Sequence, residues 1–164
     1  MSIVPDIQSE MNRLIAAANA KSILMRVLGG LAIKVHHKAD HPAFAREYGD
    51  LDFVVAGKQR REFEAFMPEV GYLPHKQFNL LNGSERQIYY HNETEMKIDI
   101  FVDTFSMCHK IPLEGRLHLH PITIPLAELF LTKVQIAQLN RKDALDIASL
   151  LLYAETGSDD ENKI

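Results

Sequence analysis

The sequence changes from acidic to apolar at Asp50-Leu51-Asp52-Phe53-Val54-Val55. Side chains alternate between the two faces of a β-strand, so the apolar residues at odd positions face a core while Asp50 and Asp52 share the other face. Two neighbouring carboxylates repel each other unless a cation lies between them, and Mg²⁺ prefers such oxygen ligands. The stretch therefore predicts a strand with a cation site on its polar face. In the alternative reading, Asp50 caps a turn and Asp52 points to water.

A second alternating segment runs from Lys97 to Asp103 and places further carboxylates on one face. Asp99 lies inside this strand, where a neighbouring strand would bring it beside the first pair. Asp103 lies on the same face at the end of the strand and is the weaker third ligand. The alternative is an exposed sheet face on which Lys97 neutralises Asp99.

Two glycines, Gly29 and Gly30, follow the apolar run from Ile23 to Leu28, and a helix is expected from Leu31 to His37. A strand, a glycine turn and a helix in this order let backbone N–H groups approach a phosphate, although the glycines also suit a simple turn. The chain contains no dinucleotide-binding fingerprint and no P-loop motif, which disfavours both of those classes.

Two helices are expected near the C-terminus, from Leu126 to Leu139 and from about Lys142 to Ala154, with Asn140 as a cap for the second. Lys133 falls in the apolar stripe of the first helix, where its ammonium needs an anion or must reach solvent at the edge. The polar residues of this helix occupy its other face: Glu128, Thr132, Gln135 and Gln138. Asp143 suits the first turn of the second helix, and Asp146 shares its polar face, facing either solvent or the rim of a cleft.

The rest of the chain predicts one mixed sheet with helices before and after it, an α+β fold. The helices are expected at Pro5 to Ala20 and Gln59 to Met67. The additional strands are expected at Gly71 to Leu73, Gln77 to Leu81 and Arg86 to His91. A loop is expected from Lys38 to Gly49, and a short extended segment from Pro121 to Pro125.

Length and charge limit the possible functions. A chain of 164 residues fits one domain, expected over residues 1–154, followed by an acidic, flexible tail over 155–164. The net charge is −4, and the tail, with four acids and one base, contributes −3 of it. The remaining −1 argues against unaided binding of long duplex DNA.

The single cysteine, Cys108, the lack of a signal-peptide pattern and the lack of a long apolar run predict a cytoplasmic protein with no membrane span. Two histidine groups, His118-x-His120 and His36-His37, are candidate zinc ligands. Zinc is disfavoured because no second cluster has ligand spacing.

Several motifs together resemble the DNA polymerase beta-type nucleotidyltransferase superfamily. They are Gly29-Gly30, Arg46 ahead of the Asp50-x-Asp52 strand, and Lys97-Ile-Asp99-Ile-Phe. The C-terminal part is similar to the minimal bacterial and archaeal subgroup that includes AbiEii/MenA-type toxins; it comprises Pro125-Leu-Ala-Glu-Leu-Phe-Leu-Thr-Lys133 and Arg141-Lys-Asp143-x-x-Asp146. The resemblance spans about residues 23 to 152.

This resemblance implies a nucleotidyltransferase-like fold, a small mixed β-sheet flanked by α-helices. It implies two Mg²⁺ ions held by Asp50, Asp52 and Asp99, and a nucleoside triphosphate whose phosphates meet the Gly29-Gly30 turn. Two metals would stabilise the attacking and leaving oxygens as a nucleoside monophosphate is transferred to a hydroxyl acceptor.

The resemblance also implies roles for four further side chains. Asp99 would be a metal ligand or the base for the acceptor hydroxyl, and Lys133 would neutralise the triphosphate. Asp143 would hold Lys133 or the base-binding side in place. Arg46 would brace the carboxylates or contact a phosphate.

The sequence departs from the family pattern at Gly30, where many relatives have serine, and in a longer gap between Gly30 and Asp50. The chain has no room for a separate acceptor-binding domain, so a tRNA 3′ end, a protein hydroxyl and a small-molecule hydroxyl all remain open as acceptors. A toxin-like role would add a cognate antitoxin as a partner. The competing hypothesis is a non-catalytic relative that binds a nucleotide or a protein.

Overall fold

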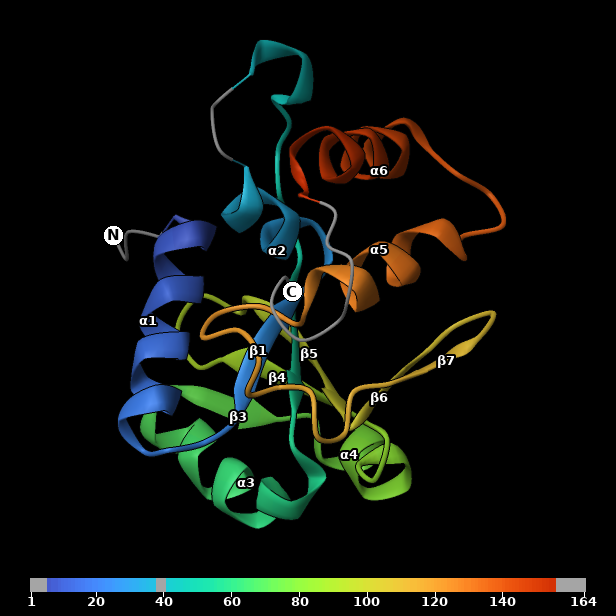
Figure 1. Cartoon of the computed structure of the whole chain (residues 1–164). Coiled ribbons are helices and arrows are strands. Elements are labelled where there is room, and N and C mark those ends of the chain that lie inside the picture. Colours follow the sequence, from blue (N-terminus) through green and yellow to red (C-terminus); the bar gives the residue numbers. More distant parts are fainter. Residues whose placement is uncertain (1–5, 38–40, 156–164) are drawn as a thin grey trace.

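The computed structural model describes residues 6–37 and 41–155 of the chain (Figure 1). Residues 1–5, 38–40 and 156–164 lie outside this part. The first residue of the expected N-terminal helix, part of the expected loop at 38–49 and nearly all of the acidic tail therefore fall outside the described residues.

A five-stranded mixed sheet forms the centre, in the order β1-β2-β5-β4-β3. The strands are β1 (Met25–Leu28), β2 (Leu51–Val55), β3 (Tyr72–Pro74), β4 (Arg86–His91) and β5 (Lys97–Val102). The central strands β2 and β5 are parallel, and every other neighbouring pair is antiparallel. The predicted mixed α+β fold is confirmed.

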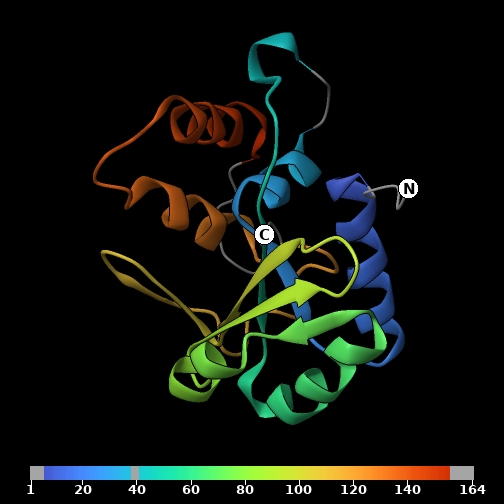
Figure 2. The ribbon, with the colours of Figure 1, turned by 180° about the vertical axis from the view of Figure 1, so that it is seen from behind.

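Helices surround this sheet (Figure 1). They are α1 (Ile7–Ala20), α2 (Gly29–His36), α3 (Arg60–Glu69), α4 (Lys76–Asn82), α5 (Leu126–Val134) and α6 (Arg141–Tyr153), with short 3-10 turns at Pro42–Phe44 and Gly57–Gln59. As Figures 1 and 2 show, α2, α5 and α6 gather at one end of the sheet, and α3 and α4 lie toward the other. A separate hairpin of β6 (Thr104–Ser106) and β7 (Lys110–Pro112) extends from the body below α5 in both views.

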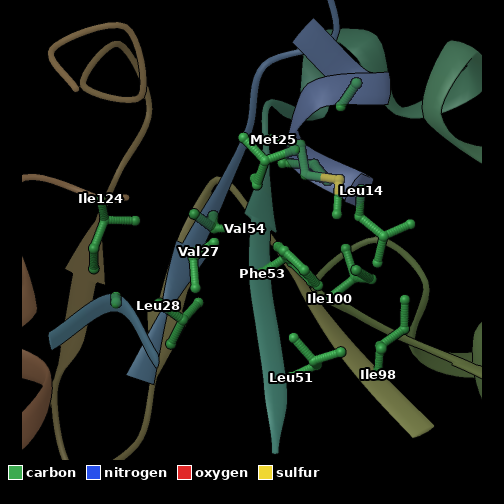
Figure 3. Close-up of a cluster of buried hydrophobic side chains, with 14 of the residues drawn as sticks. Leu14, Met25, Val27, Leu28, Leu51, Phe53, Val54, Ile98, Ile100 and Ile124 are labelled. Atoms are coloured by element: carbon green, nitrogen blue, oxygen red, sulfur yellow. The ribbon is translucent and has the colours of Figure 1, made fainter. Parts of the chain in front are cut away.

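The core forms where the apolar face predicted for β2 and β5 meets the helices. Leu51, Phe53, Ile98 and Ile100 are almost completely buried. Figure 3 shows them on the same side of the sheet as Leu14 of α1. Burying a side chain of this size contributes about 1.5–3 kcal/mol, so the alternation of these strands fixes which face turns inward and leaves the aspartates on the other.

Tertiary contacts overrode two local predictions. The strand expected at Gln77 to Leu81 is instead helix α4. The His75 side chain caps its N-terminus, and the Asn79 side chain hydrogen-bonds both backbone groups of Ile88 in β4. Leu80 and Leu81 remain exposed, so the apolar residues that suggested a strand do not enter the core.

The first C-terminal helix is also shorter than expected, ending at Val134 rather than Leu139. Its polar residues Glu128 and Thr132 are buried, because Glu128 pairs with Arg116 and the Thr132 hydroxyl donates to the Leu129 carbonyl. The second helix, α6, begins as predicted, with the Asn140 side chain accepting a hydrogen bond from the Asp143 backbone. Among the described residues, no helix has both the length and the apolar character needed to cross a bilayer.

Candidate functional site

Strand register brings Asp52 and Asp99 side by side. In the parallel pair β2 and β5, Asp52 is the direct partner of Asp99, and adjacent strands are about 4.8 Å apart. On its other side, Asp52 pairs with Leu28, the last residue of β1. The Gly29-Gly30 turn therefore begins beside Asp52.

Gly29 lies in direct contact with the Asp52 carboxylate. Its φ of +74° is in the left-handed region, and a Cβ at this position would lie 2.9 Å from Asp52 Oδ2. A side chain here would be both strained and obstructed. Glycine thus lets the carboxylate approach the bare backbone at the start of α2.

The Asp52 carboxylate is partly buried, and burial disfavours its charged form. Burial raises its pKa to about 6, helped by the negative charges of Asp99 and Asp50 and opposed by Lys133 and Arg86. Among the described residues, no group donates a hydrogen bond to this carboxylate or forms an ion pair with it. A cation bound here would stabilise the charged form.

Asp99, in contrast, already has cationic partners. Its Oδ1 accepts from the Arg86 guanidinium at 2.6 and 3.0 Å, and its Oδ2 lies 2.7 Å from the Lys97 ammonium. Neutralisation by Lys97, left open by the sequence, is therefore present, and Arg86 of β4 was not identified from the sequence. The one available signal was its place at the start of an alternating strand.

The remaining acids of the predicted set are divided between two ends of the sheet. Asp50 is exposed just before β2, where its charge still acts on Asp52. Asp103 lies beyond the far end of β5 and accepts a hydrogen bond from the Gly57 backbone at 2.8 Å. Asp99, rather than Asp103, is thus the carboxylate that lies beside Asp52.

No three side chains of His, Cys, Asp or Glu are grouped to hold a metal ion anywhere in residues 6–37 and 41–155. The donors at Asp52 and Asp99 nevertheless suit Mg²⁺, which commonly takes one or two carboxylates and completes its shell with phosphate oxygens and water. The two-ion site of Asp50, Asp52 and Asp99 remains a prediction.

The histidines considered for zinc have structural partners instead. His36 Nε2 lies 2.7 Å from the Thr123 hydroxyl, which also lies 3.0 Å from His120 Nδ1. His118 is an exposed residue of a turn rather than part of a strand.

Lys133 belongs to a buried network of charges at the α5–α6 junction. Its ammonium lies 3.1 Å from Asp143 Oδ1 and 2.9 Å from Asp146 Oδ2. Arg46 makes a two-pronged contact with the same Asp146 carboxylate, at 2.8 and 3.0 Å. Asp146 is only 2% exposed, so it neutralises two cations that reach it from distant segments.

The position of Arg46 also explains why residue 30 is a glycine. A Cβ at Gly30 would lie 2.0 Å from an Arg46 guanidinium nitrogen, and the guanidinium stacks 4.1 Å from the Tyr48 ring centre. Arg46 therefore braces Asp146 and packs on the turn, and it makes no ion pair with the strand carboxylates. Serine at position 30 would require Arg46 to move.

Asp52 and Lys133 border a cavity of about 540 Å³, whereas Asp99, Arg46 and Asp146 are not among the residues that line it. Its polar part is lined by Gly29, Asp52, Arg86, Lys133 and Asp143. Its other part is apolar and comes from β5, the β6–β7 hairpin and the segment after α5. The sequence did not predict the contribution of the hairpin. The volume is that of a site for a small molecule.

No family model matches the chain, and no curated protein matches it in sequence. Solved structures do resemble it. The lincosamide antibiotic adenylyltransferase LnuA, in a lincomycin-bound crystal structure, superposes with a TM-score of 0.62 at 15% identity, over 87% of this chain and 95% of that one. The ANT(2")-Ia complex with adenylyl-2"-tobramycin gives a TM-score of 0.60 at 14% identity, over 88% and 87%.

A nucleotidyltransferase-like protein from Paracoccidioides brasiliensis gives a TM-score of 0.54 at 14% identity, over 94% of this chain and 79% of that one. At such low identity the likeness concerns the fold, and it does not support assignment to the AbiEii/MenA-type subgroup in particular. The chain has the nucleotidyltransferase-like fold that its motifs implied.

Proposed function

We propose that this protein is a nucleotidyltransferase that moves a nucleoside monophosphate from a nucleoside triphosphate to a hydroxyl acceptor. The observation that carries the proposal is the direct pairing of Asp52 with Asp99 beside the Gly29 turn, with Lys133 lining the same cavity. The acceptor oxygen bonds to the α-phosphorus as the bond to the bridging oxygen of the β-phosphate breaks. Pyrophosphate leaves, and the hydroxyl proton passes to a carboxylate of the pair or to water.

Each part of the chain has a defined task in this reaction. The backbone at Gly29 and Gly30 receives phosphate oxygens at the start of α2, where unpaired N–H groups favour anions. Lys133, held by Asp143, adds positive charge toward the triphosphate. Asp50, Asp52 and Asp99 hold Mg²⁺, which when bound neutralises phosphate charge and activates the attacking oxygen.

A small molecule is the acceptor that we favour. The structures named above include an adenylyltransferase with lincomycin and one with an adenylylated tobramycin, and this chain spans 95% and 87% of their lengths. The net charge of −4 also does not suit binding to a long polyanion. A tRNA end, a protein hydroxyl and a toxin role with an antitoxin have no support in the contacts or the comparisons.

Nucleotide binding and turnover test the proposal. Wild-type protein with Mg²⁺ and each nucleoside triphosphate should show a raised melting temperature, and an α-labelled nucleotide should label a hydroxyl compound from a small-molecule extract. Asp52→Asn should abolish labelling, whereas Asp103→Asn, beyond the far end of β5, should retain it. Equal labelling by wild type and Asp52→Asn would contradict the assignment.

The pairing of Asp99 with Arg86 and Lys97 favours a second candidate, a non-catalytic relative that binds a nucleotide or a protein. In that case Asp99 is already neutralised and needs no metal. Such a protein would bind nucleotide equally well in Mg²⁺ and in EDTA and would release no pyrophosphate. A titration of nucleotide in Mg²⁺ and in EDTA therefore distinguishes the two candidates.

A further inference from the structure

One side of the cavity is an apolar wall, made of Phe101, Phe105, Met107 and Ile136. Phe101 and Phe105 pack with their ring centres 4.9 Å apart, and Met107 is 57% exposed. The wall combines three elements, because β5 supplies Phe101, β6 and the adjoining turn supply the next two, and the segment after α5 supplies Ile136. Exposed apolar surface inside a cavity is typical of a ligand site.

The wall lies next to the reacting carboxylates. Phe101 follows Asp99 by two residues on the same strand, so both side chains project from one face about 7 Å apart. Phe101 is also the register partner of Val54, two residues after Asp52. A hydroxyl placed at the carboxylates would therefore have the rest of its molecule lying over the wall.

Arg86 extends this surface. Its guanidinium lies 5.5 Å from the Phe101 ring centre and 5.8 Å from that of Phe78, while its nitrogens bond Asp99. A guanidinium held by these contacts can stack on aromatic rings of a ligand as well as pair with anions. The wall is thus apolar with one cationic edge.

The charges of the cavity argue against a polycationic acceptor. Its lining contains two acids, Asp52 and Asp143, and two bases, Arg86 and Lys133. Asp143 is paired with Lys133. A ligand that carries several ammonium groups would find no surplus of carboxylates once Asp52 binds a metal.

We propose that the acceptor is an uncharged or weakly charged amphiphile, with its hydroxyl beside a compact apolar or aromatic group that packs on the wall. This inference rests on the proposed function and names its substrate class. The hairpin is then the element that selects the acceptor, through Phe105 and Met107. The Gln135 side chain, which accepts a hydrogen bond from the His109 backbone at 2.7 Å, holds the turn of the hairpin against the end of α5.

Calorimetric titration of three probes into the protein saturated with Mg²⁺ and α,β-methylene-ATP tests the inference. The probes are para-nitrophenyl glucoside, glucose and the polyamine sugar kanamycin. We expect the aryl glucoside to bind at least about tenfold more tightly than glucose, and kanamycin no more tightly than glucose. Phe105→Ala and Met107→Ala should remove this preference, and Phe105→Leu should restore part of it.

Leu131→Ala is the matched control, because Leu131 is 48% exposed on α5 but does not line the cavity. Tighter binding of kanamycin, an aryl glucoside that binds no better than glucose, or a preference unchanged in Phe105→Ala would each overturn the inference. A wall variant that loses the ATP analogue while keeping the glucoside preference would also overturn it, since the wall would then hold the nucleobase. Failure of wild type to bind the ATP analogue would instead refute the proposed function.

Discussion

The carboxylate of Asp52 lies 2.9 Å from the point that a Cβ at Gly29 would occupy. Asp52 belongs to β2 and Gly29 is the first residue of α2, directly after β1. The antiparallel pairing of Leu28 with Asp52 brings the two residues together. The contact links the turn for which we propose phosphate binding to the strand for which we propose metal binding. We therefore expect a side chain at position 29 to displace the Asp52 carboxylate.

Gly29→Ala should therefore lower the free energy of unfolding by more than backbone strain alone. Gly115→Ala is the control, because Gly115 has the same φ of +74° but no atom within 4 Å of its Cβ position. Strain should cost about 1–2 kcal/mol at either site, with additional loss only at position 29. Urea denaturation measures the free energy of unfolding of both variants. Equal losses would show that the contact with Asp52 adds nothing to the cost of a side chain at position 29.

Asp52→Asn should stabilise the metal-free protein at neutral pH. The folded pKa of about 6 lies above the ordinary 3.8, so the native state binds more protons between these values and loses stability as pH rises through them. After allowance for solvent screening, removing the charge should raise the free energy of unfolding by about 1–2 kcal/mol at pH 8 and change it little near pH 4. Urea denaturation in EDTA at both pH values measures this.

Asp50→Asn is the comparison for that experiment, since Asp50 is exposed and acts on Asp52 only through its charge. Asp50→Asn should raise the free energy of unfolding at pH 8 by less than Asp52→Asn does. A loss of stability in Asp52→Asn at pH 8 would mean that the carboxylate has a partner in the folded state that the structure does not show.

The effect of His36 on the free energy of unfolding should depend on pH in the direction opposite to that of Asp52. Burial, together with the charges of His120 and His37, lowers its pKa from 6.5 to about 4. The native state then binds fewer protons than the unfolded chain between these values, so stability is lost as pH falls from 6.5 toward 4. His36→Gln, which keeps a partner for Thr123, should reduce this loss by about 1–3 kcal/mol.

Because the Asp52 and His36 effects oppose each other over much of the same range, wild type alone cannot separate them. The difference between wild type and His36→Gln, measured by urea denaturation at pH 7 and pH 4.5, isolates the histidine. If both proteins lost the same free energy of unfolding between pH 7 and pH 4.5, His36 would not be a source of the acid sensitivity.

Asp146→Ala should be strongly destabilising, because it leaves Arg46 and Lys133 facing each other without their shared carboxylate. Breaking a buried pair in this way costs about 3–5 kcal/mol. Glu69→Ala, which breaks the half-exposed pair with Lys21, should cost less than about 1 kcal/mol. Thermal and urea unfolding test both, and similar effects of the two variants would mean that Asp146 is not buried as the structure shows.

Local periodicity was sufficient for much of the fold. The alternation around Asp52 and Asp99 identified the two central strands and their polar face, and the glycines after Leu28 marked the turn into α2. These predictions succeeded because side-chain direction along a strand and the backbone freedom of glycine are properties of a few consecutive residues. The same reasoning failed at Gln77 to Leu81, where bonds from Asn79 to β4 stabilise a helix.

Tertiary structure alone decided which distant residues meet. Asp99 and Asp103 belong to the same alternating segment, and only the register of β5 against β2 selects Asp99 as the neighbour of Asp52. The pairing of Arg86 with Asp99 and the burial of Asp146 between two cations likewise depend on segments far apart in the chain. The acidic strand and the glycine turn can be predicted from a few consecutive residues. The cavity and its apolar wall cannot, because strand register and helix packing depend on how the side chains of the whole core pack together.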